Sequence, residues 1–240
     1  MLNPHGDKIA TYGNGQRAIS PDGSSATTTS LSPGSIAVDH AGNIIYADGT
    51  INRVRRINIA NGKLETVAGI GPSILGENGP ALETVAGTGT EGSGLAIARN
   101  GDLLIGDTGT FRLRELLGDG TLKTIGGAGG ILGPQNDGVP ATEAAIYPVA
   151  MTVDSRGEID VSNRSDIVHI DASGRLFHTS TRDVNRCTLD GEGGPFPNAS
   201  ICQPWDVLRD ANDNLLIADT NNNRIRVLTT IPPHRRATRR

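Results

Sequence analysis

The sequence is poor in aromatic residues, which make up 3% of its 240 residues and include one tryptophan. It has no run of 18 apolar residues, so it predicts no membrane-spanning helix. The first 15 residues also lack the apolar core of a signal peptide. Two alternatives stay open for the localisation: the protein remains inside the cell, or the chain lacks its original start, which would allow a periplasmic or extracellular location.

Basic residues are scarce outside the C-terminus. The net charge is −4, but four of the basic residues fall within the last six positions (Arg235, Arg236, Arg239 and Arg240). The rest of the chain has 18 basic and 26 acidic residues and therefore repels phosphate backbones. With few aromatic side chains to stack on bases, this acidic body disfavours a nucleic-acid partner. Residues 232–240 are expected to form a solvated, disordered tail, and contact with nucleic acid or anionic lipid is the alternative.

The chain has two cysteines, Cys187 and Cys202, at the ends of one glycine-rich loop. A disulfide between them would add about 3 kcal/mol of stability on the chain-entropy model. Such a bond requires an oxidising compartment, so two free thiols remain the alternative.

Glycine is abundant, with 32 residues, which is typical of many tight turns. Four similar segments recur, starting at Pro33, Gly92, Pro148 and Pro204, and these starts lie 59, 56 and 56 residues apart. Each segment is joined to a shorter strand-like piece and to a loop with an Asp-Gly or Asn-Gly pair. Such a fixed period indicates a repeat protein.

Each repeat reads as four short strands separated by turn signals. The second strand is a continuous apolar run, as in Leu103-Leu104-Ile105, which indicates burial on both faces. The third strand alternates basic and apolar residues, as in Arg112-Leu113-Arg114. Four-stranded sheets that are covered on both faces and recur at a fixed period predict an all-β propeller of antiparallel blades.

The segments GSIAVDHAGNIIYAD, GLAIARNGDLLIGDTGTFRLRE and NLLIADTNNNRIRVL resemble NHL repeats, and loops such as NDGVPATEAAIYP resemble those of a bacterial long-repeat branch of that family. The resemblance extends from about residue 7 to residue 229. It implies a β-propeller, a fold that serves in this family for RNA binding, protein binding, sensing and occasionally catalysis.

We therefore expect one propeller domain over residues 1–231 with four repeats. The N-terminal residues 8–13 have the phase of a fourth strand, whereas the last repeat ends after its third. The sequence thus predicts that residues 8–13 complete the last blade and close a four-blade ring. The alternative is an open arc of a larger propeller, whose exposed terminal blades would favour self-association.

An Asp-x4-Arg-x-Arg pattern recurs in three repeats. We expect a structural ion pair across the turn between the Asp and the first Arg in each. The third repeat departs from this pattern, with Asn163 and Val168 at these places. The predicted pairs are Asp48 with Arg53, Asp107 with Arg112, and Asp219 with Arg224.

The turns after the second strands and the loops before the first strands fall at one end of a propeller. Polar side chains gather there, and the only tryptophan enters the fourth repeat at the same end. We expect this loop-bearing end to bind a protein or a small polar ligand, with no cofactor, metal or catalytic residue. The candidate ligand-binding residues are Asp22, Asp137, Asp190, Trp205, Asn221 and Asn222.

The alternative function is a propeller lyase or lactonase that uses a metal in the central channel. Such an enzyme would place histidines or carboxylates on the first strands, which line the channel. Those positions are almost all apolar, with Asp206 as the exception, and the five histidines share no position in the repeat. The sequence thus favours a binding scaffold over an enzyme.

Overall fold

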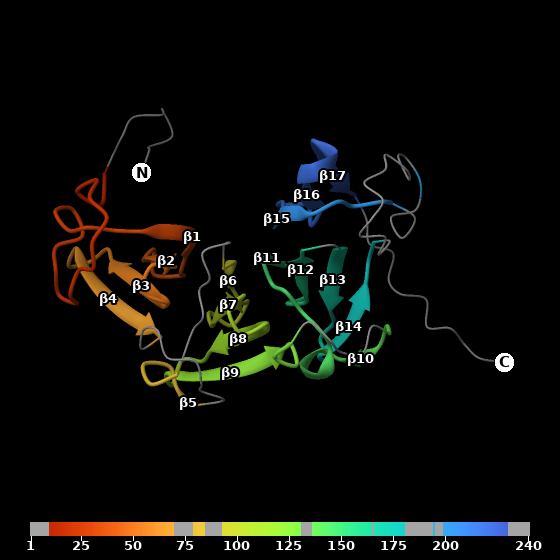
Figure 1. Cartoon of the computed structure of the whole chain (residues 1–240), viewed down its shortest axis with the longest axis horizontal. Coiled ribbons are helices and arrows are strands. Elements are labelled where there is room, and N and C mark those ends of the chain that lie inside the picture. The colour runs from red at the N-terminus through yellow and green to blue at the C-terminus, as the bar shows by residue number, and fades with distance from the viewer. Residues whose placement is uncertain are drawn as a thin grey trace.

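The computed structural model describes residues 10–69, 79–84, 93–130, 136–164, 166–180, 194 and 199–229. Four antiparallel sheets are arranged as a four-blade β-propeller (Figure 1), which confirms the predicted fold class. Within the described residues, no helix is long and apolar enough to cross a membrane.

The four blades follow the order of the chain. Blade 1 contains β1 (Pro33–Val38), β2 (Ile44–Asp48), β3 (Arg53–Asn58) and β4 (Lys63–Ala68). Blade 2 contains β6 (Leu95–Ile97), β7 (Leu103–Asp107), β8 (Arg112–Leu116) and β9 (Thr121–Gly126), with β5 (Gly79–Pro80) at its outer edge. Blade 3 contains β11 (Ala150–Val153), β12 (Ile159–Asn163), β13 (Asp166–Ile170) and β14 (Arg175–His178), with β10 (Val139–Pro140) at its outer edge. Blade 4 contains β15 (Pro204–Arg209), β16 (Leu215–Asp219) and β17 (Arg224–Leu228). Among the described residues, the short 3-10 helices η1 (Ala141–Glu143) and η3 (Thr220–Asn222) lie in the connections.

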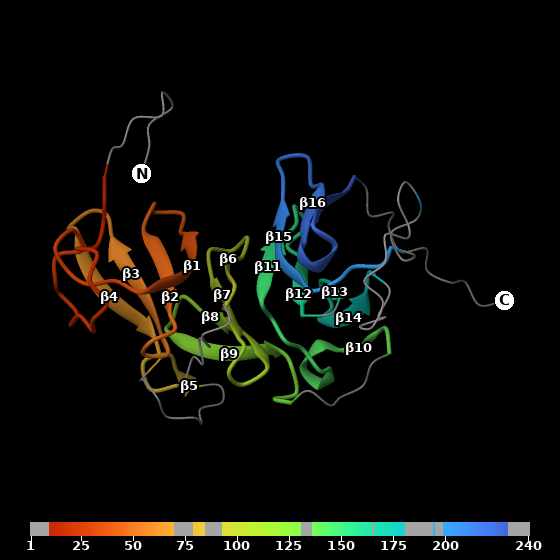
Figure 2. The same cartoon turned by 45° about the horizontal axis from the view of Figure 1, so that its top comes forward.

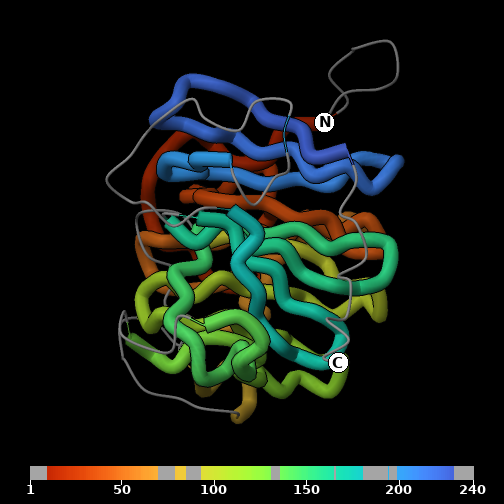
Figure 3. Tube along the Cα trace, turned by 90° about the vertical axis from the view of Figure 1, so that its right-hand side faces the viewer, coloured from red at the N-terminus to blue at the C-terminus, as the bar shows by residue number. Residues whose placement is uncertain are grey.

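The second strand of each blade is apolar because another sheet packs against it. Ile105 of β7 and Val161 of β12 have no exposed surface. One apolar core joins blades 1 and 2, another joins blades 2 and 3, and a third joins blades 3 and 4. Figure 2 shows the inner strands β1, β6, β11 and β15 next to one another, and Figure 3 shows the sheets of blades 3 and 4 stacked.

The loop before each blade folds against the outer strand of that blade. In blades 1 to 3 an alanine of this loop donates its backbone N–H to the glycine carbonyl in the turn before the outer strand, at 2.8–2.9 Å. All three alanines are buried: Ala81 and Ala141 lie in the cores that join two blades, whereas Ala26 packs in a cluster of blade 1 and its own loop. The donor–acceptor pairs are Ala26 with Gly62, Ala81 with Gly120, and Ala141 with Gly174.

The prediction that residues 8–13 complete the last blade is wrong for the part of that segment the structure describes. The sheet of blade 4 has the order β15-β16-β17, and Tyr12 packs instead against a core cluster of blade 1. The reason is local: residues 10–31 form the loop of blade 1, where Gly13 N–H bonds the Ala26 carbonyl at 2.7 Å and Ser25 bridges Lys63 of β4. Residues 8 and 9 lie outside the described residues.

Candidate functional site

The turns between second and third strands are fixed by buried ion pairs, but the partners differ from those we predicted. Arg114 Nε donates to Asp107 Oδ2 at 2.9 Å, and Arg226 Nε donates to Asp219 Oδ2 at 2.6 Å. The carboxylate is thus bound by the second arginine of the pattern. The first arginine lies directly opposite the aspartate in the ladder, and the second lies two residues further along the strand. In blade 2 the first arginine, Arg112, donates through Nη1 to the Thr110 carbonyl at 3.0 Å.

Blade 1 uses a different acidic partner for its second arginine. Arg55 Nη2 lies 2.8 Å from Asp22 Oδ1 and 3.0 Å from the Ser20 carbonyl, while Asp48 Oδ1 accepts from Thr50. Asp22 therefore fixes the loop of blade 1 to its sheet, where we had placed it among ligand-binding residues.

Two more predicted ligand-binding residues make bonds within their own blades. Asp137 Oδ1 accepts the His178 backbone N–H at 2.8 Å, and the buried Asn222 donates to the Ser200 carbonyl at 3.1 Å. Asn221 connects the turn of blade 4 to the strand that carries Trp205, because Asn221 Nδ2 donates to Oε1 of Gln203, two residues before the tryptophan, at 2.8 Å. Asp190 lies outside the described residues, as do Cys187 and the tail at 232–240. Cys202 is disulfide-bonded.

Three aromatic rings from blades 2, 3 and 4 meet near the loop-bearing end. The Phe111 and Tyr147 ring centroids lie 5.5 Å apart and their planes are tilted by 54°. The Arg164 guanidinium carbon lies 5.4 Å from the Tyr147 centroid, a cation–π distance. Trp205 is 48% exposed and lines a cavity of about 160 Å³ with Tyr147, Val149, Arg164, Gln203 and Pro204. We call these six lining residues, together with Phe111, the aromatic site.

The backbone of the aromatic site is strained at three positions. Phe111, Arg164 and Gln203 have φ values of +58°, +53° and +46°, which are uncommon for residues other than glycine. At the turn position of Phe111, blades 1 and 4 have Asn52 and Asn223, and asparagine tolerates this conformation well. Strain of this kind concentrates at binding sites, where the surrounding structure maintains it.

Arg164 reaches this site because the turn of blade 3 is shorter than the others. Asn163 pairs directly with Asp166, whereas Asp107 pairs with Arg112 across four intervening residues. Val168 is consequently the counterpart of the second arginine, and the blade has no arginine there. Instead, Asp166 Oδ2 lies 2.6 Å from His178 Nδ1, and Asn163 Oδ1 accepts the Tyr147 backbone N–H at 2.6 Å.

The open polar groups of the aromatic site are donors. Arg164 is exposed and, within the described part of the chain, its guanidinium makes no hydrogen bond. The Trp205 indole N–H and the Gln203 amide N–H₂ likewise have no acceptor among the described residues, since Gln203 uses only its oxygen. Among the described residues that line the cavity, Arg164 is also the only one with a charged side chain. The site therefore complements a ligand that is rich in acceptors.

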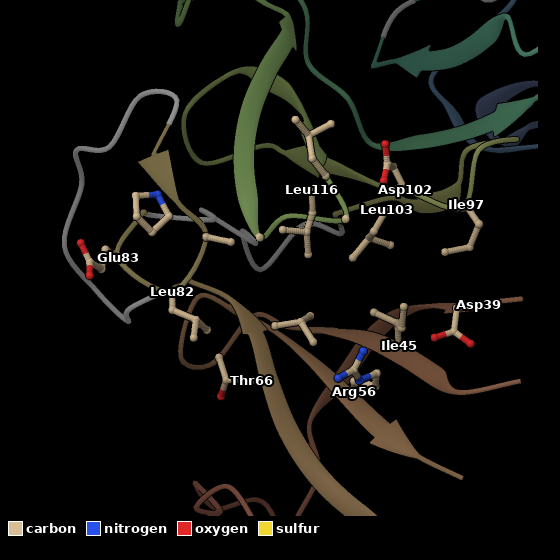
Figure 4. A pocket seen from close by; sticks show the side chains of 17 residues that line it. Asp39, Ile45, Arg56, Thr66, Leu82, Glu83, Ile97, Asp102, Leu103 and Leu116 are labelled. Carbon is tan, nitrogen blue, oxygen red and sulfur yellow. The ribbon is translucent and has the colours of Figure 1, made fainter. Parts of the chain in front are cut away.

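A second cavity, of about 520 Å³, lies between blades 1 and 2 (Figure 4). Its walls are mainly apolar, with Ile45 facing Leu103 and Leu116 across it. Three of its four charged groups have partners among the described residues: Arg56 bonds Glu65, Asp39 accepts from Asn43, and Asp102 accepts from Asn100. The fourth, Glu83, is exposed. This cavity presents less open hydrogen-bonding capacity than the aromatic site.

The channel strands bring together few ionisable groups. Asp206 Oδ1 accepts the Val207 backbone N–H at 2.9 Å, which gives this carboxylate a local role. Across the described ranges, no group of three or more His, Cys, Asp or Glu side chains could hold a metal ion.

One buried charge network lies on the seam between blades 3 and 4. His169 Nδ1 is 3.0 Å from Asp160 Oδ1, and Arg209 of blade 4 donates through Nε to Asp160 Oδ2 at 2.8 Å. Burial lowers the pKa of His169, but the hydrogen bond to Asp160 and the nearby charges of Asp160, Glu158 and Asp154 outweigh it, so the pKa is raised. The network joins the two blades that carry Arg164 and Trp205.

The comparisons with known proteins agree with this fold. Residues 202–228 match the family model of the NHL repeat. The chain is a β-propeller with an NHL repeat in its last blade, consistent with the NHL-repeat β-propeller family. The comparison with curated protein sequences gives no match.

Three of the similar solved structures show the range of proteins with this fold. A protein of unknown function from Bacteroides thetaiotaomicron is 19% identical, with a TM-score of 0.64 over 81% of this chain and 46% of its own. An auxiliary nutrient binding protein from the same organism is 15% identical, with a TM-score of 0.59 over 83% and 48%. Virginiamycin B lyase from Staphylococcus aureus is 16% identical, with a TM-score of 0.50 over 81% and 51%. The chain spans about half the length of each of these structures, and the likeness shows the fold alone.

Proposed function

We propose that this propeller is a non-catalytic binding scaffold whose aromatic site holds a small, acceptor-rich ring, such as a cyclic carboxylate. The observation that carries this proposal is the convergence of unpaired donors from Arg164, Gln203 and Trp205 on one small cavity. A ligand carboxylate accepts bidentate hydrogen bonds from the Arg164 guanidinium, and its ring lies on the exposed face of Trp205.

The size of the cavity limits the ligand. Drug-sized sites have volumes of about 300–1,000 Å³. The aromatic site, at about 160 Å³, has room for a single ring. A sugar acid and an aromatic acid both satisfy this chemistry. The nutrient-binding neighbour supports ligand binding by such a propeller in general.

The fluorescence of Trp205, the only tryptophan, reports on the site directly. We would titrate the full chain with glucuronate and benzoate at constant ionic strength, and with glucose and benzamide as uncharged counterparts. At least one carboxylate should give a saturable change in Trp205 emission, and its uncharged counterpart should bind more weakly. Arg164→Ala should weaken carboxylate binding roughly tenfold or more, since a charge-assisted bond contributes about 1.5–3 kcal/mol.

Arg99→Ala is the matched control, because Arg99 is also an exposed arginine but lies in the turn after β6, at the opposite end of the blade. This variant should bind like the wild type. Equal binding of charged and uncharged probes, or an Arg164→Ala variant with unchanged affinity, contradicts the proposal. Loss of binding after dialysis against EDTA would instead favour the metal-dependent lyase or lactonase.

A further inference from the structure

The two terminal blades expose faces that are buried in every other blade. We define the leading face as the exposed side of β1 with Ile36 and Val38, and the trailing face as the exposed side of blade 4 with Leu208, Ile225 and Val227. In Figure 1 these strands stand at the two ends of the arc of blades.

The leading face is equivalent to surfaces that contact a preceding blade. Ile36 of β1 pairs with Tyr46, the third residue of the second strand in blade 1. In the other blades, the first-strand residues that pair with the third residue of the second strand are Leu95, Met151 and Val207. These three counterparts are 8%, 5% and 3% exposed because each packs against the blade before it, whereas Ile36 is 65% exposed.

The trailing face is equivalent to surfaces that contact a following blade. Ile225 occupies the second position of its third strand, as do Val54, Leu113 and Ile167. All three counterparts are 0% exposed, whereas Ile225 is 76% exposed. The two end faces are therefore the two halves of an interface that the chain forms internally three times.

A backbone hydrogen bond shows which strand belongs beside the leading face. At the end of β4, Gly69 N–H donates to the Ala81 carbonyl of the next blade, and at the end of β9, Gly127 N–H donates to that of Ala141. Gly13 N–H makes the same bond to Ala26 of blade 1. Residues 10–13 thus occupy the place where the outer strand of a preceding blade ends, while the described sheet of blade 4 ends at β17.

We infer that a second copy of this chain stacks its trailing face on the leading face, so that residues 10–13 of one copy lie beside β17 of the other. The contact is head to tail and repeats the apolar positions of the internal blade-to-blade packing. The Gly13–Ala26 hydrogen bond within each copy holds residues 10–13 in place for it. When each of two copies places its trailing face on the leading face of the other, both end faces of both copies are buried. The inference rests on the fold and is independent of the proposed ligand.

Light scattering coupled to size exclusion tests this contact on the full chain at increasing protein concentration. The wild type should show at least twice the mass of one chain. Ile36→Asp and Ile225→Asp each place a charge in the contact and should each weaken association roughly tenfold or more. Leu82→Asp is the matched control, because Leu82 is 56% exposed but lies on neither end face. It should associate like the wild type, and circular dichroism should show all variants folded.

Mixing the two variants separates this arrangement from others. An equimolar mixture of Ile36→Asp and Ile225→Asp retains one intact leading face and one intact trailing face, so it should form a dimer that neither variant forms alone. A wild type that stays monomeric overturns the inference. So does a dimer that survives in either single variant, because that result indicates contact between like faces.

Discussion

The buried ion pair of blade 2 predicts a large loss of stability when one partner is removed. The Arg114 and Asp107 side chains are 2% and 0% exposed, and their closest atoms are 2.9 Å apart. Arg114→Met keeps much of the side-chain volume but leaves the Asp107 carboxylate buried without its cation. Breaking a buried pair in this way costs about 3–5 kcal/mol, so we expect the free energy of unfolding to fall by that amount.

The double variant Asp107→Leu/Arg114→Met removes both charges and should recover a large part of this loss. Arg56→Met is the control for the loss of an arginine. Its partner Glu65 and Arg56 itself are 31% and 37% exposed, so the change should be less than about 1 kcal/mol.

Urea unfolding followed by both Trp205 fluorescence and circular dichroism gives these free energies, provided that the two transitions coincide. A loss below about 1 kcal/mol for Arg114→Met would refute the view that this pair holds the turn. The same conclusion would follow if the double variant were less stable than Arg114→Met.

Two further predictions concern His169 and Phe111. Because the pKa of His169 is raised in the fold, its protonated form stabilises the protein below its unfolded pKa of about 6.5, and this contribution is lost as the pH rises through the folded pKa. The difference in unfolding free energy between the wild type and His169→Gln should therefore shrink from pH 5.5 to pH 9, and a constant difference would contradict the assignment. Phe111→Asn introduces the residue that blades 1 and 4 have at this strained turn. We expect the free energy of unfolding to stay the same or to rise by up to about 1 kcal/mol, and carboxylate binding in the Trp205 titration to become weaker. Unchanged binding would show that the Phe111–Tyr147 contact does not shape the site.

The fold was predictable from the sequence because one physical signal recurs. Apolar second strands such as Leu103–Ile105, at a constant interval, need a sheet on each face, and a propeller supplies both. The position of the N-terminal segment was not predictable in the same way. Residues 8–13 have the pattern of a fourth strand, but the blade that residues 10–13 contact depends on the Gly13–Ala26 bond, a backbone interaction without a side-chain signal.

The aromatic site was only partly predictable. Trp205 stood out because it is unique, but Phe111, Tyr147 and Arg164 come from different repeats, and no local pattern connects them. One signal was present: the aligned turns place Phe111 where the other repeats have Asn52 and Asn223, and a bulky residue at a position of positive φ is a departure. The turn between the second and third strands of blade 3 is two residues shorter than in blade 2, and this shortening directs Arg164 to the site. It could be recognised only from the strand register in the structure.

Amide hydrogen exchange with and without glucuronate or benzoate, whichever changes Trp205 emission, tests the central claim most directly. The account places the ligand between blades 3 and 4, with Phe111 of blade 2 packed against Tyr147, so protection should rise together in four segments: 108–112, 147–149, 163–164 and 203–205. The turn around Arg99 should exchange at the same rate in both states. Protection confined to one blade, or centred on the cavity between blades 1 and 2, would contradict the assignment of the aromatic site.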